Sequence, residues 1–314
     1  MPRKADARTF GQDLMRGEHV VGGAQHSKQT ASSDGLLAIG IASGAYDQRA
    51  GEDAPPSATG TSIFDPVLCE IAYRWFCPPG GLVLDPFAGG SVRGIVAAKL
   101  GRRYLGIELR EEQVAANNAQ RAEICAESDT QPSWLVGDSR EIEDLTQGVE
   151  ADFIFSCPPY ADLERYSDDP ADLSAMKWDD FQRAYREIIS ATCALLRPDR
   201  FACFVVGDVR DKKTGFYRGL PALTTEAFIA GGARLYNQAI LVTAVGSLPL
   251  RVSRQFEASR KLGNTHQHVL VYCKGDPKAA TTAVGECEFG AIDEQPPTED
   301  SQYGERMTAA DIGL

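Results

Sequence analysis

Residues 82–91, with the sequence LVLDPFAGGS, decide the fold. The first four residues are an apolar run that favours a buried β-strand, and a turn with two adjacent glycines follows directly. Residues 92–100 have the apolar spacing of a helix, and residues 103–107 form a second apolar run that ends at Glu108. Strand, glycine-containing turn, helix and strand in this order predict a β-α-β unit of a parallel α/β sheet.

The glycine turn and the end of the second strand are suited to a nucleotide-like cofactor. The glycines let the backbone approach a ligand closely, because no Cβ stands in the way. Glu108 follows Gly89 by 19 residues (108 − 89), and an acidic side chain at that place binds ribose hydroxyls. A third apolar run, residues 134–136, ends in Gly137 and Asp138, which adds an acceptor at the same edge of the sheet.

A further apolar run, residues 152–155, is followed by the sequence SCPPY at residues 156–160. The two prolines stop the strand and donate no N–H, so that their carbonyls remain free to accept a hydrogen bond from a ligand. Tyr160 offers a flat face on which a planar group can stack. Because ligands bind at the carboxyl ends of parallel strands, this loop predicts a site that grips a nucleobase by its exocyclic amino group.

Taken together, these motifs resemble the amino-methyltransferases that act on DNA with S-adenosylmethionine. That family has a DPFxGxG-like first motif and a (D/N/S)PP(Y/F/W) catalytic motif, which stand here as residues 85–90 (DPFAGG) and 157–160 (CPPY). The resemblance covers roughly residues 62–275 and implies an α/β fold of the Rossmann-like class I methyltransferase type, doubly wound around a mostly parallel seven-stranded sheet. Strands are expected near residues 82–85, 103–107, 134–136, 152–155, 201–207, 234–244 and 268–273, and helices near 65–76, 91–100, 111–125, 177–196 and 219–231.

The resemblance also implies roles for individual residues. A base is expected to flip out of the duplex and stack on Tyr160, while the Cys157-Pro158 segment orients its amino nitrogen toward the methyl group. The residues implied in catalysis are Ser156, Cys157, Pro158, Pro159 and Tyr160. The residues implied in binding S-adenosylmethionine, and its product S-adenosylhomocysteine, are Phe64, Asp65, Asp85, Pro86, Phe87, Ala88, Gly89, Gly90, Glu108, Asp138 and Ser139.

The chain departs from the family pattern at two positions. Ser91 follows the two glycines where the first motif has its last glycine, and Cys157 stands where the family has Asp, Asn or Ser. A thiol is a weak acceptor, so the carbonyl of Pro158 or the hydroxyl of Ser156 is an alternative partner for the amino group, although strand alternation points Ser156 elsewhere. Two further readings of Cys157 are a nucleophile, as in cytosine-C5 methyltransferases, and a buried thiol that fills space.

Charge is distributed unevenly along the chain. The formal net charge is −12, yet residues 201–275 carry 10 Lys and Arg against 4 Asp and Glu, a net charge of +6 (10 − 4). Because phosphate contacts need local cations, double-stranded DNA is the expected partner of this stretch and of a polar, lid-like loop at 161–176. The residues expected to contact DNA are Arg165, Tyr166, Arg210, Lys212, Lys213, Arg218, Arg251, Arg254, Arg260 and Lys261.

Composition predicts the organisation of the chain. Residues 1–60 are expected to be a flexible N-terminal arm, residues 61–277 the catalytic domain with small DNA-recognition insertions near 161–176 and 246–265, and residues 278–314 an acidic disordered tail. The eight cysteines occur singly and the four histidines lack metal-ligand spacing, so we expect reduced thiols and no metal. Without a membrane-length apolar run, the chain is expected in the cytoplasm of a bacterial or phage-like host.

The sequence leaves several alternatives open. It does not decide between N6 of adenine and N4 of cytosine as the target. A catalytically silent subunit that binds cofactor and DNA for a modification complex is one alternative, which Cys157 favours, and a methyltransferase acting on RNA or on a protein amide is another. The oligomeric state, a homodimer included, and the association with a restriction enzyme also stay open.

Overall fold

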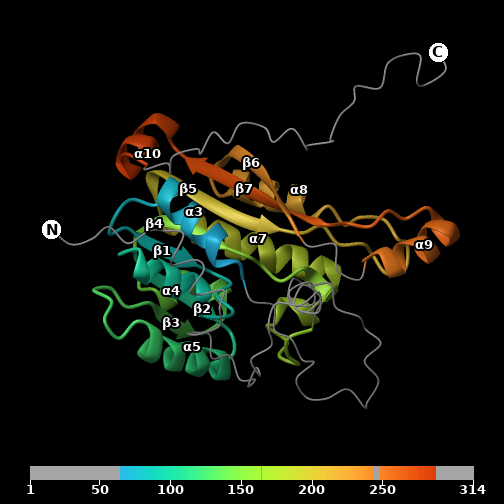
Figure 1. The fold of residues 1–314 in the computed structure, drawn as a ribbon, viewed down its shortest axis with the longest axis horizontal. Coiled ribbons are helices and arrows are strands. Elements are labelled where there is room, and N and C mark those ends of the chain that lie inside the picture. Colours follow the sequence, from blue (N-terminus) through green and yellow to red (C-terminus); the bar gives the residue numbers. More distant parts are fainter. Residues whose placement is uncertain (1–63, 164, 244–247, 288–314) are drawn as a thin grey trace, which may run out of the picture.

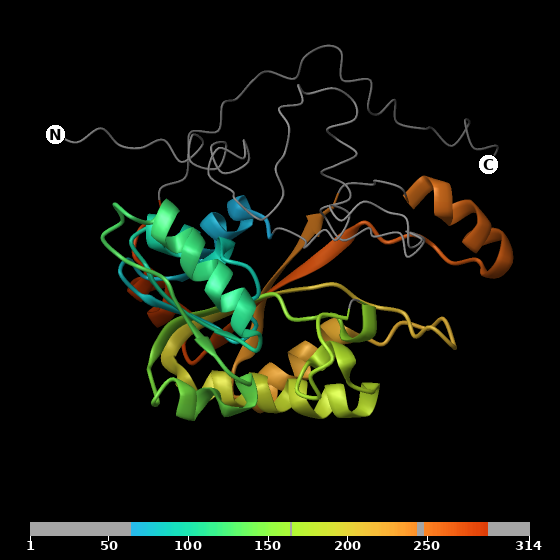
Figure 2. The ribbon, with the colours of Figure 1, turned by 90° about the horizontal axis from the view of Figure 1, so that it is seen from below.

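The chain folds around one seven-stranded sheet. The computed structural model describes residues 64–163, 165–243 and 248–287. The strand order is β3-β2-β1-β4-β5-β7-β6; β7 runs antiparallel to β5 and β6, and the other neighbouring pairs are parallel. Helices cover both faces of the sheet (Figures 1 and 2). The predicted Rossmann-like, doubly wound and mostly parallel seven-stranded fold is therefore confirmed.

All seven predicted strands are present. The largest difference is that β5 begins five residues before the expected start, at Leu196. The strands are β1 (Leu82–Asp85), β2 (Arg103–Glu108), β3 (Ser133–Val136), β4 (Ala151–Ser156), β5 (Leu196–Val206), β6 (Arg234–Val242) and β7 (His266–Lys274).

The five predicted helices are present as well, with ends within one or two residues of expectation. They are α3 (Pro66–Phe76), α4 (Val92–Lys99), α5 (Glu111–Ile124), α7 (Trp178–Leu195) and α8 (Leu220–Ala230). The structure adds the 3-10 turns η2 (Ser139–Glu141), η3 (Ala161–Leu163) and η4 (Leu173–Ala175), and the helices α6 (Ile142–Leu145), α9 (Leu248–Ser259) and α10 (Pro277–Val284).

The central strand β4 carries the loop at 156–160. All six of its residues are buried, as expected for a parallel strand covered on both faces. Phe153 and Phe155 point to the cluster that contains Tyr73 of α3, whereas Ile154 points to the cluster on the α7 side. The rings of Phe155 and Tyr73 meet edge to face, with centroids 5.3 Å apart. The loop at 156–160 therefore leaves a strand that is packed on both sides.

Helix α10 corrects the predicted C-terminal tail. Asp276 caps it by accepting a hydrogen bond from the N–H of Lys278 (2.9 Å), and Pro277 occupies its first turn. Ala280 and Val284 are four residues apart and both are buried. The prediction of a disordered tail from residue 278 is thus wrong as far as residue 287, while residues 288–314 and the predicted arm at 1–60 lie outside the described residues.

The predicted insertion at 246–265 contains a helix, and its residues 246–247 lie outside the described residues. Residues 248–259 make up α9, which projects beyond the end of the sheet (Figures 1 and 2). Over the part of the chain that the structure describes, no helix has the length and apolar character needed to span a bilayer.

Candidate active site at the carboxyl edge of the sheet

The parallel strands bring the predicted motifs to one edge. The glycine turn follows β1, Glu108 ends β2, Asp138 follows β3 and the loop at 156–160 follows β4. Because β1 to β4 run in the same direction, their carboxyl ends lie along the same edge of the sheet. This is the place where open α/β sheets bind their ligands.

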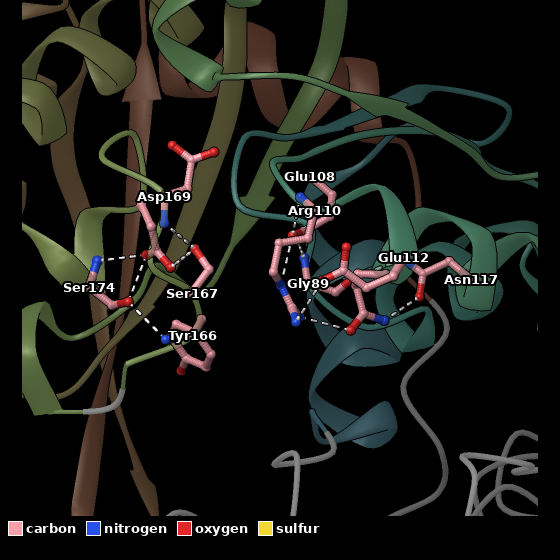
Figure 3. A network of polar contacts seen from close by, with 11 residues as sticks. Gly89, Glu108, Arg110, Glu112, Asn117, Tyr166, Ser167, Asp169 and Ser174 are labelled. Carbon is pink, nitrogen blue, oxygen red and sulfur yellow. Dashed lines mark hydrogen bonds and ion pairs between the residues drawn. The ribbon is translucent and has the colours of Figure 1, made fainter.

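The Gly89 turn is fixed by contacts from β2 and α5. The N–H of Gly89 donates to Oε2 of Glu108 (2.9 Å), and Nδ2 of Asn117 donates to the Gly89 carbonyl (2.8 Å; Figure 3). The other oxygen of Glu108 accepts from the N–H of Arg110 (3.0 Å). Gly89 has φ +51°, and a Cβ added at Gly89 or Gly90 would have no heavy atom within 4 Å. The turn is therefore left-handed and open on that side.

Glu108 keeps the capacity to bind a ligand. Each carboxylate oxygen accepts one backbone hydrogen bond and has a lone pair to spare. Burial raises the pKa of Glu108 above the ordinary value for a glutamate, although the N–H groups of Arg110 and Gly89 act in the opposite direction. The predicted role as an acceptor for ribose hydroxyls fits this arrangement.

Asp85 does not fit the role predicted for it. Its side chain is fully buried, and Oδ1 accepts from the N–H of Phe87 (3.1 Å) and the hydroxyl of Ser156 (2.5 Å). Its Oδ2 accepts from Nε of Arg93 (2.6 Å) and the hydroxyl of Tyr104 (2.7 Å). With four partners and no exposed surface, Asp85 holds the turn together instead of contacting a cofactor. The same contact turns the Ser156 hydroxyl toward Asp85, which agrees with the strand alternation.

Arg93 is a key residue that the sequence reasoning missed. Its guanidinium donates to the carbonyls of Phe87 (2.6 Å) and Ala88 (2.8 Å) in addition to Asp85. It also lies over the ring of Phe64, 4.8 Å from the centroid. Burial would lower the pKa of Arg93, but the charge and hydrogen bond of Asp85, together with Tyr104 and Cys157, raise it above the ordinary value. Arg93 therefore stays charged and neutralises Asp85 inside the turn.

Three other predicted cofactor residues also serve to shape the edge. The hydroxyl of Ser139 donates to the Pro86 carbonyl, which ties the loop after β3 to the glycine turn. Asp138 accepts from the N–H of Arg140 (2.9 Å) and pairs with its guanidinium (2.5 Å). Ala88 is fully buried. Of these, only the partly exposed Asp138 is placed to reach a ligand.

The remaining predicted cofactor residues lie at the two ends of the turn. Phe87 is half-buried and stacks on Tyr185 of α7, with centroids 5.9 Å apart. Asp65 caps α3 by accepting from the N–H groups of Val67 (2.8 Å) and Leu68 (3.3 Å). Through its neighbour Phe64, which lies under Arg93, the start of α3 is held beside the glycine turn.

The catalytic loop contains a small network around Tyr160. The Tyr160 hydroxyl lies 3.4 Å from Sγ of Cys157 and accepts a hydrogen bond from Nε2 of Gln267 on β7 (2.7 Å). Its ring lies against Gly207 at the end of β5, where an added Cβ would stand only 3.2 Å from Cε2. Burial raises the pKa of Tyr160 well above its ordinary value, so the phenol is neutral. Gln267 was not foreseen from the sequence.

The predicted lid at 161–176 is internally bonded. The N–H of Tyr166 donates to the hydroxyl of Ser174 (3.0 Å), and the hydroxyl of Ser167 donates to the buried Asp172 (2.8 Å; Figure 3). Arg165 pairs with Asp168 at 2.7 Å. Residues 165–174 are thus bonded to one another, and Arg165 already has an acidic partner.

Most of the cations predicted to contact DNA lie either in the loop after β5 or in and just after helix α9. Arg210, Lys212, Arg254 and Lys261 line one open cleft between the loop after β5 and helix α9. The guanidinium of Arg260 lies over the ring of Phe256, at 5.0 Å from the centroid. The predicted contact residues Lys213 and Arg218 belong to the same loop, and the side chain of Arg251 lies outside the described residues.

The strand order is that of a Rossmann-like sheet, and comparisons with known proteins show what the chain is similar to. Residues 70–119 match the family model of the N6/N4 DNA methylases. Over 49 residues, the chain is 43% identical to YubD of Escherichia coli (strain K12), which is named as a methylase. That match spans 16% of this chain and 22% of YubD, well under two thirds of the relative. Both matches are similarities over a short part of the chain.

Solved methyltransferase structures show a distant likeness. TrmN from Thermus thermophilus is 18% identical, with a TM-score of 0.47 over 67% of this chain and 49% of TrmN. Magnesium protoporphyrin IX methyltransferase (ChlM) from Synechocystis PCC 6803 with bound SAH is 13% identical, with a TM-score of 0.47 over 85% of this chain and 95% of ChlM.

Proposed function

We propose that the chain transfers a methyl group from S-adenosylmethionine to the exocyclic amino group of a base in DNA, N4 of cytosine or N6 of adenine. The observation that carries the proposal is the meeting, at one sheet edge, of the open Gly89 turn, the Glu108 carboxylate and the Tyr160 loop. The family match over residues 70–119, which include the glycine turn and Glu108, also supports the proposal.

The residues at the glycine turn fit an adenosyl cofactor. Gly89 and Gly90 leave open space where a side chain would stand, and Glu108 has acceptor capacity for ribose hydroxyls. Asp138, 19% exposed, adds a second acceptor at the same edge. When bound, S-adenosylmethionine supplies an electrophilic methyl group. Asp85 and Arg93, which neutralise each other, would keep the turn in shape without touching the cofactor.

The loop at 157–160 fits a planar amino-bearing base. Proline carbonyls at 158 and 159 lack a competing N–H of their own residue and would accept the amino hydrogens, which orients the nitrogen lone pair. Tyr160 is held by Gln267 and Gly207, so a base can stack on a ring that is already fixed. A base reaches this loop only after leaving the duplex stack. Orientation would then supply most of the rate acceleration, and the released proton goes to solvent.

A transfer assay with labelled methyl donor tests the proposal. Purified protein is incubated with tritiated S-adenosylmethionine and, in separate reactions, with duplex DNA, RNA or protein extract, while calorimetry measures cofactor affinity. We expect label in DNA. Label in RNA or protein alone would contradict the proposed substrate. Cofactor binding without transfer to any polymer would contradict the proposed activity and indicate a silent subunit.

A further inference from the structure

An open cleft lies beyond the catalytic loop, between residues 208–218 and helix α9. Its lining includes four cations, two from each wall, together with the hydrogen-bonding side chains of Gln255 and Ser259. Lysine and arginine side chains in such a concave place suit phosphate groups, which carry the negative charge of a nucleic acid. The four cations are Arg210, Lys212, Arg254 and Lys261.

The wall formed by residues 208–218 is a well-defined turn. Oδ1 of Asp211 accepts from the N–H groups of Lys213 (3.0 Å) and Thr214 (2.7 Å) and from the Thr214 hydroxyl (3.0 Å). Its Oδ2 accepts from Arg218 (3.2 Å). Hydrogen bonds from Thr214, above all, lower the pKa of Asp211 to about 2. The charge of this single acid in the cleft is therefore taken up by the turn and by Arg218.

Three of the cations, Arg210, Arg254 and Lys261, supply positive charge to the cleft. Arg210 packs over the Tyr217 ring (3.8 Å to the centroid) and donates to the Gly215 carbonyl (3.0 Å), which fixes its position without neutralising its charge. Within the described ranges, Arg254 and Lys261 have no acidic partner within ion-pair distance. The end of Lys261 reaches across to the turn, since a Cβ at Gly215 would lie 2.9 Å from its Nζ.

Both walls of the cleft start at strands that hold Tyr160. The turn leaves β5 at Gly207, against which the Tyr160 ring packs, and Arg210 follows three residues later, at most about 10 Å away. The other wall enters β7, where Gln267 binds the Tyr160 hydroxyl. The two walls of the cleft are thus joined along the chain to the two strands that hold Tyr160, and the turn also carries the exposed ring of Phe216 (76%).

From this geometry we propose that the cleft binds the phosphate backbone of the DNA strand that carries the target base, close to the nucleotide held at Tyr160. The inference rests on the proposed methyl transfer to DNA. The contribution of the cleft to DNA binding is electrostatic and independent of base sequence, because phosphate contacts position a strand whereas base contacts read its sequence. The two α9-side residues Arg254 and Lys261 carry the clearest unpaired charge and are the place to test it.

The test measures the salt dependence of DNA binding. Fluorescence anisotropy with a mixed-sequence duplex, between about 50 and 200 mM salt, gives the slope of log K against log salt. The double variant Arg254→Ala, Lys261→Ala should lower the magnitude of that slope by about 1.8, since each lost phosphate contact removes about 0.9. The matched control is Lys99→Ala, Lys278→Ala, which removes the same charge from two exposed positions away from the cleft.

The outcomes separate this inference from the proposed function. We expect the control to keep the wild-type slope and both double variants to keep wild-type cofactor affinity and thermal stability. An equal decrease of the slope in both double variants would overturn the cleft as the binding place, as would an unchanged slope in the cleft variant. Failure of the wild-type chain to bind DNA would overturn the inference too. If the wild-type chain does not bind S-adenosylmethionine, the proposed function itself is contradicted.

Discussion

The two halves of the ligand edge are built in different ways. On the side of β1 and β2, the polar groups of the glycine turn are satisfied by other residues of the chain, with Asp85 and Arg93 buried at its centre. On the side of β4, β5 and β7, a short network around Tyr160 is followed by a cleft lined by four cations, of which Arg254 and Lys261 have no acidic partner among the described residues. The family match at 70–119 covers the first half and ends before the second. The comparison shows a glycine turn whose shape is fixed by contacts within the chain, next to a more open edge lined by cations.

The largest effect on stability is expected from removing Asp85, which lies buried at the centre of the β1 and β2 side of the edge. Asp85→Ala leaves the buried Arg93 guanidinium without its carboxylate partner, and removing one member of a buried ion pair costs about 3–5 kcal/mol. Urea unfolding should show this loss of unfolding free energy. The control Arg103→Ala removes an ion pair with Asp152 at 3.7 Å, in which the Arg103 side chain is 57% exposed. That control should cost at most about 1 kcal/mol, and an equal loss in both variants would refute the distinction.

A smaller effect on stability, with a specific effect on binding, is expected at the glycine turn. Gly89→Ala forces a side chain into φ +51°, which costs about 1–2 kcal/mol, and places a methyl group on the open side of the turn. Gly148→Ala creates the same backbone strain at φ +68°, before β4 and away from the ligand edge. Calorimetry should show weaker cofactor binding for Gly89→Ala alone. Equal affinities in the two variants would mean that the turn does not face the cofactor.

Substitutions on the side of β4, β5 and β7 are expected to lower kcat and to leave cofactor affinity unchanged. Gln267→Leu removes the hydrogen bond to the Tyr160 hydroxyl, worth about 1 kcal/mol, so kcat should fall about fivefold. Gln238→Leu is the control, since Gln238 bonds the ring of His268 on the exposed side of β7. Steady-state kinetics and a cofactor titration separate the two quantities. A change of cofactor affinity without a change of kcat would contradict a positioning role for Gln267.

The smallest effect expected is a dependence of cofactor affinity on pH. Burial raises the pKa of Glu108, so its carboxylate gains a proton, and loses acceptor capacity, at a higher pH than an exposed glutamate does. As the pH falls, affinity should therefore begin to weaken above the usual range of glutamate titration. Glu108→Gln should bind more weakly at neutral pH and show a flatter profile. The same profile in wild type and variant would exclude Glu108 as the titrating group.

Much of the first half was predictable because its signals are local. The apolar runs of β1 and β2, the glycine turn and Glu108 lie within 27 residues of one another (108 − 82 + 1), and each has a recognised spacing. The helix α10 also had local signals, a capping Asp276 followed by Pro277, but only Ala280 and Val284 are buried along its eight residues. Two apolar positions are too few to distinguish a short helix from a polar tail.

The contacts that define both halves were beyond sequence reasoning, since they join distant residues. Gln267 and Tyr160 are 107 residues apart and meet only because β7 inserts beside β5. Arg93 is eight residues from Asp85, yet an arginine within an apolar helix gives no hint that it turns inward. The role predicted for Asp85 failed for the same reason, as its four partners come from four different elements or loops.

The most direct test of the account is the position of the transferred methyl group. DNA methylated by the wild-type chain and by Cys157→Ala is digested to nucleosides and analysed by mass spectrometry. We predict N4-methylcytosine or N6-methyladenine with the wild-type chain and the same product, at a reduced rate, with Cys157→Ala, because the proline carbonyls still accept the amino hydrogens. 5-Methylcytosine from the wild-type chain, lost completely in Cys157→Ala, would contradict amino transfer and make Cys157 a nucleophile.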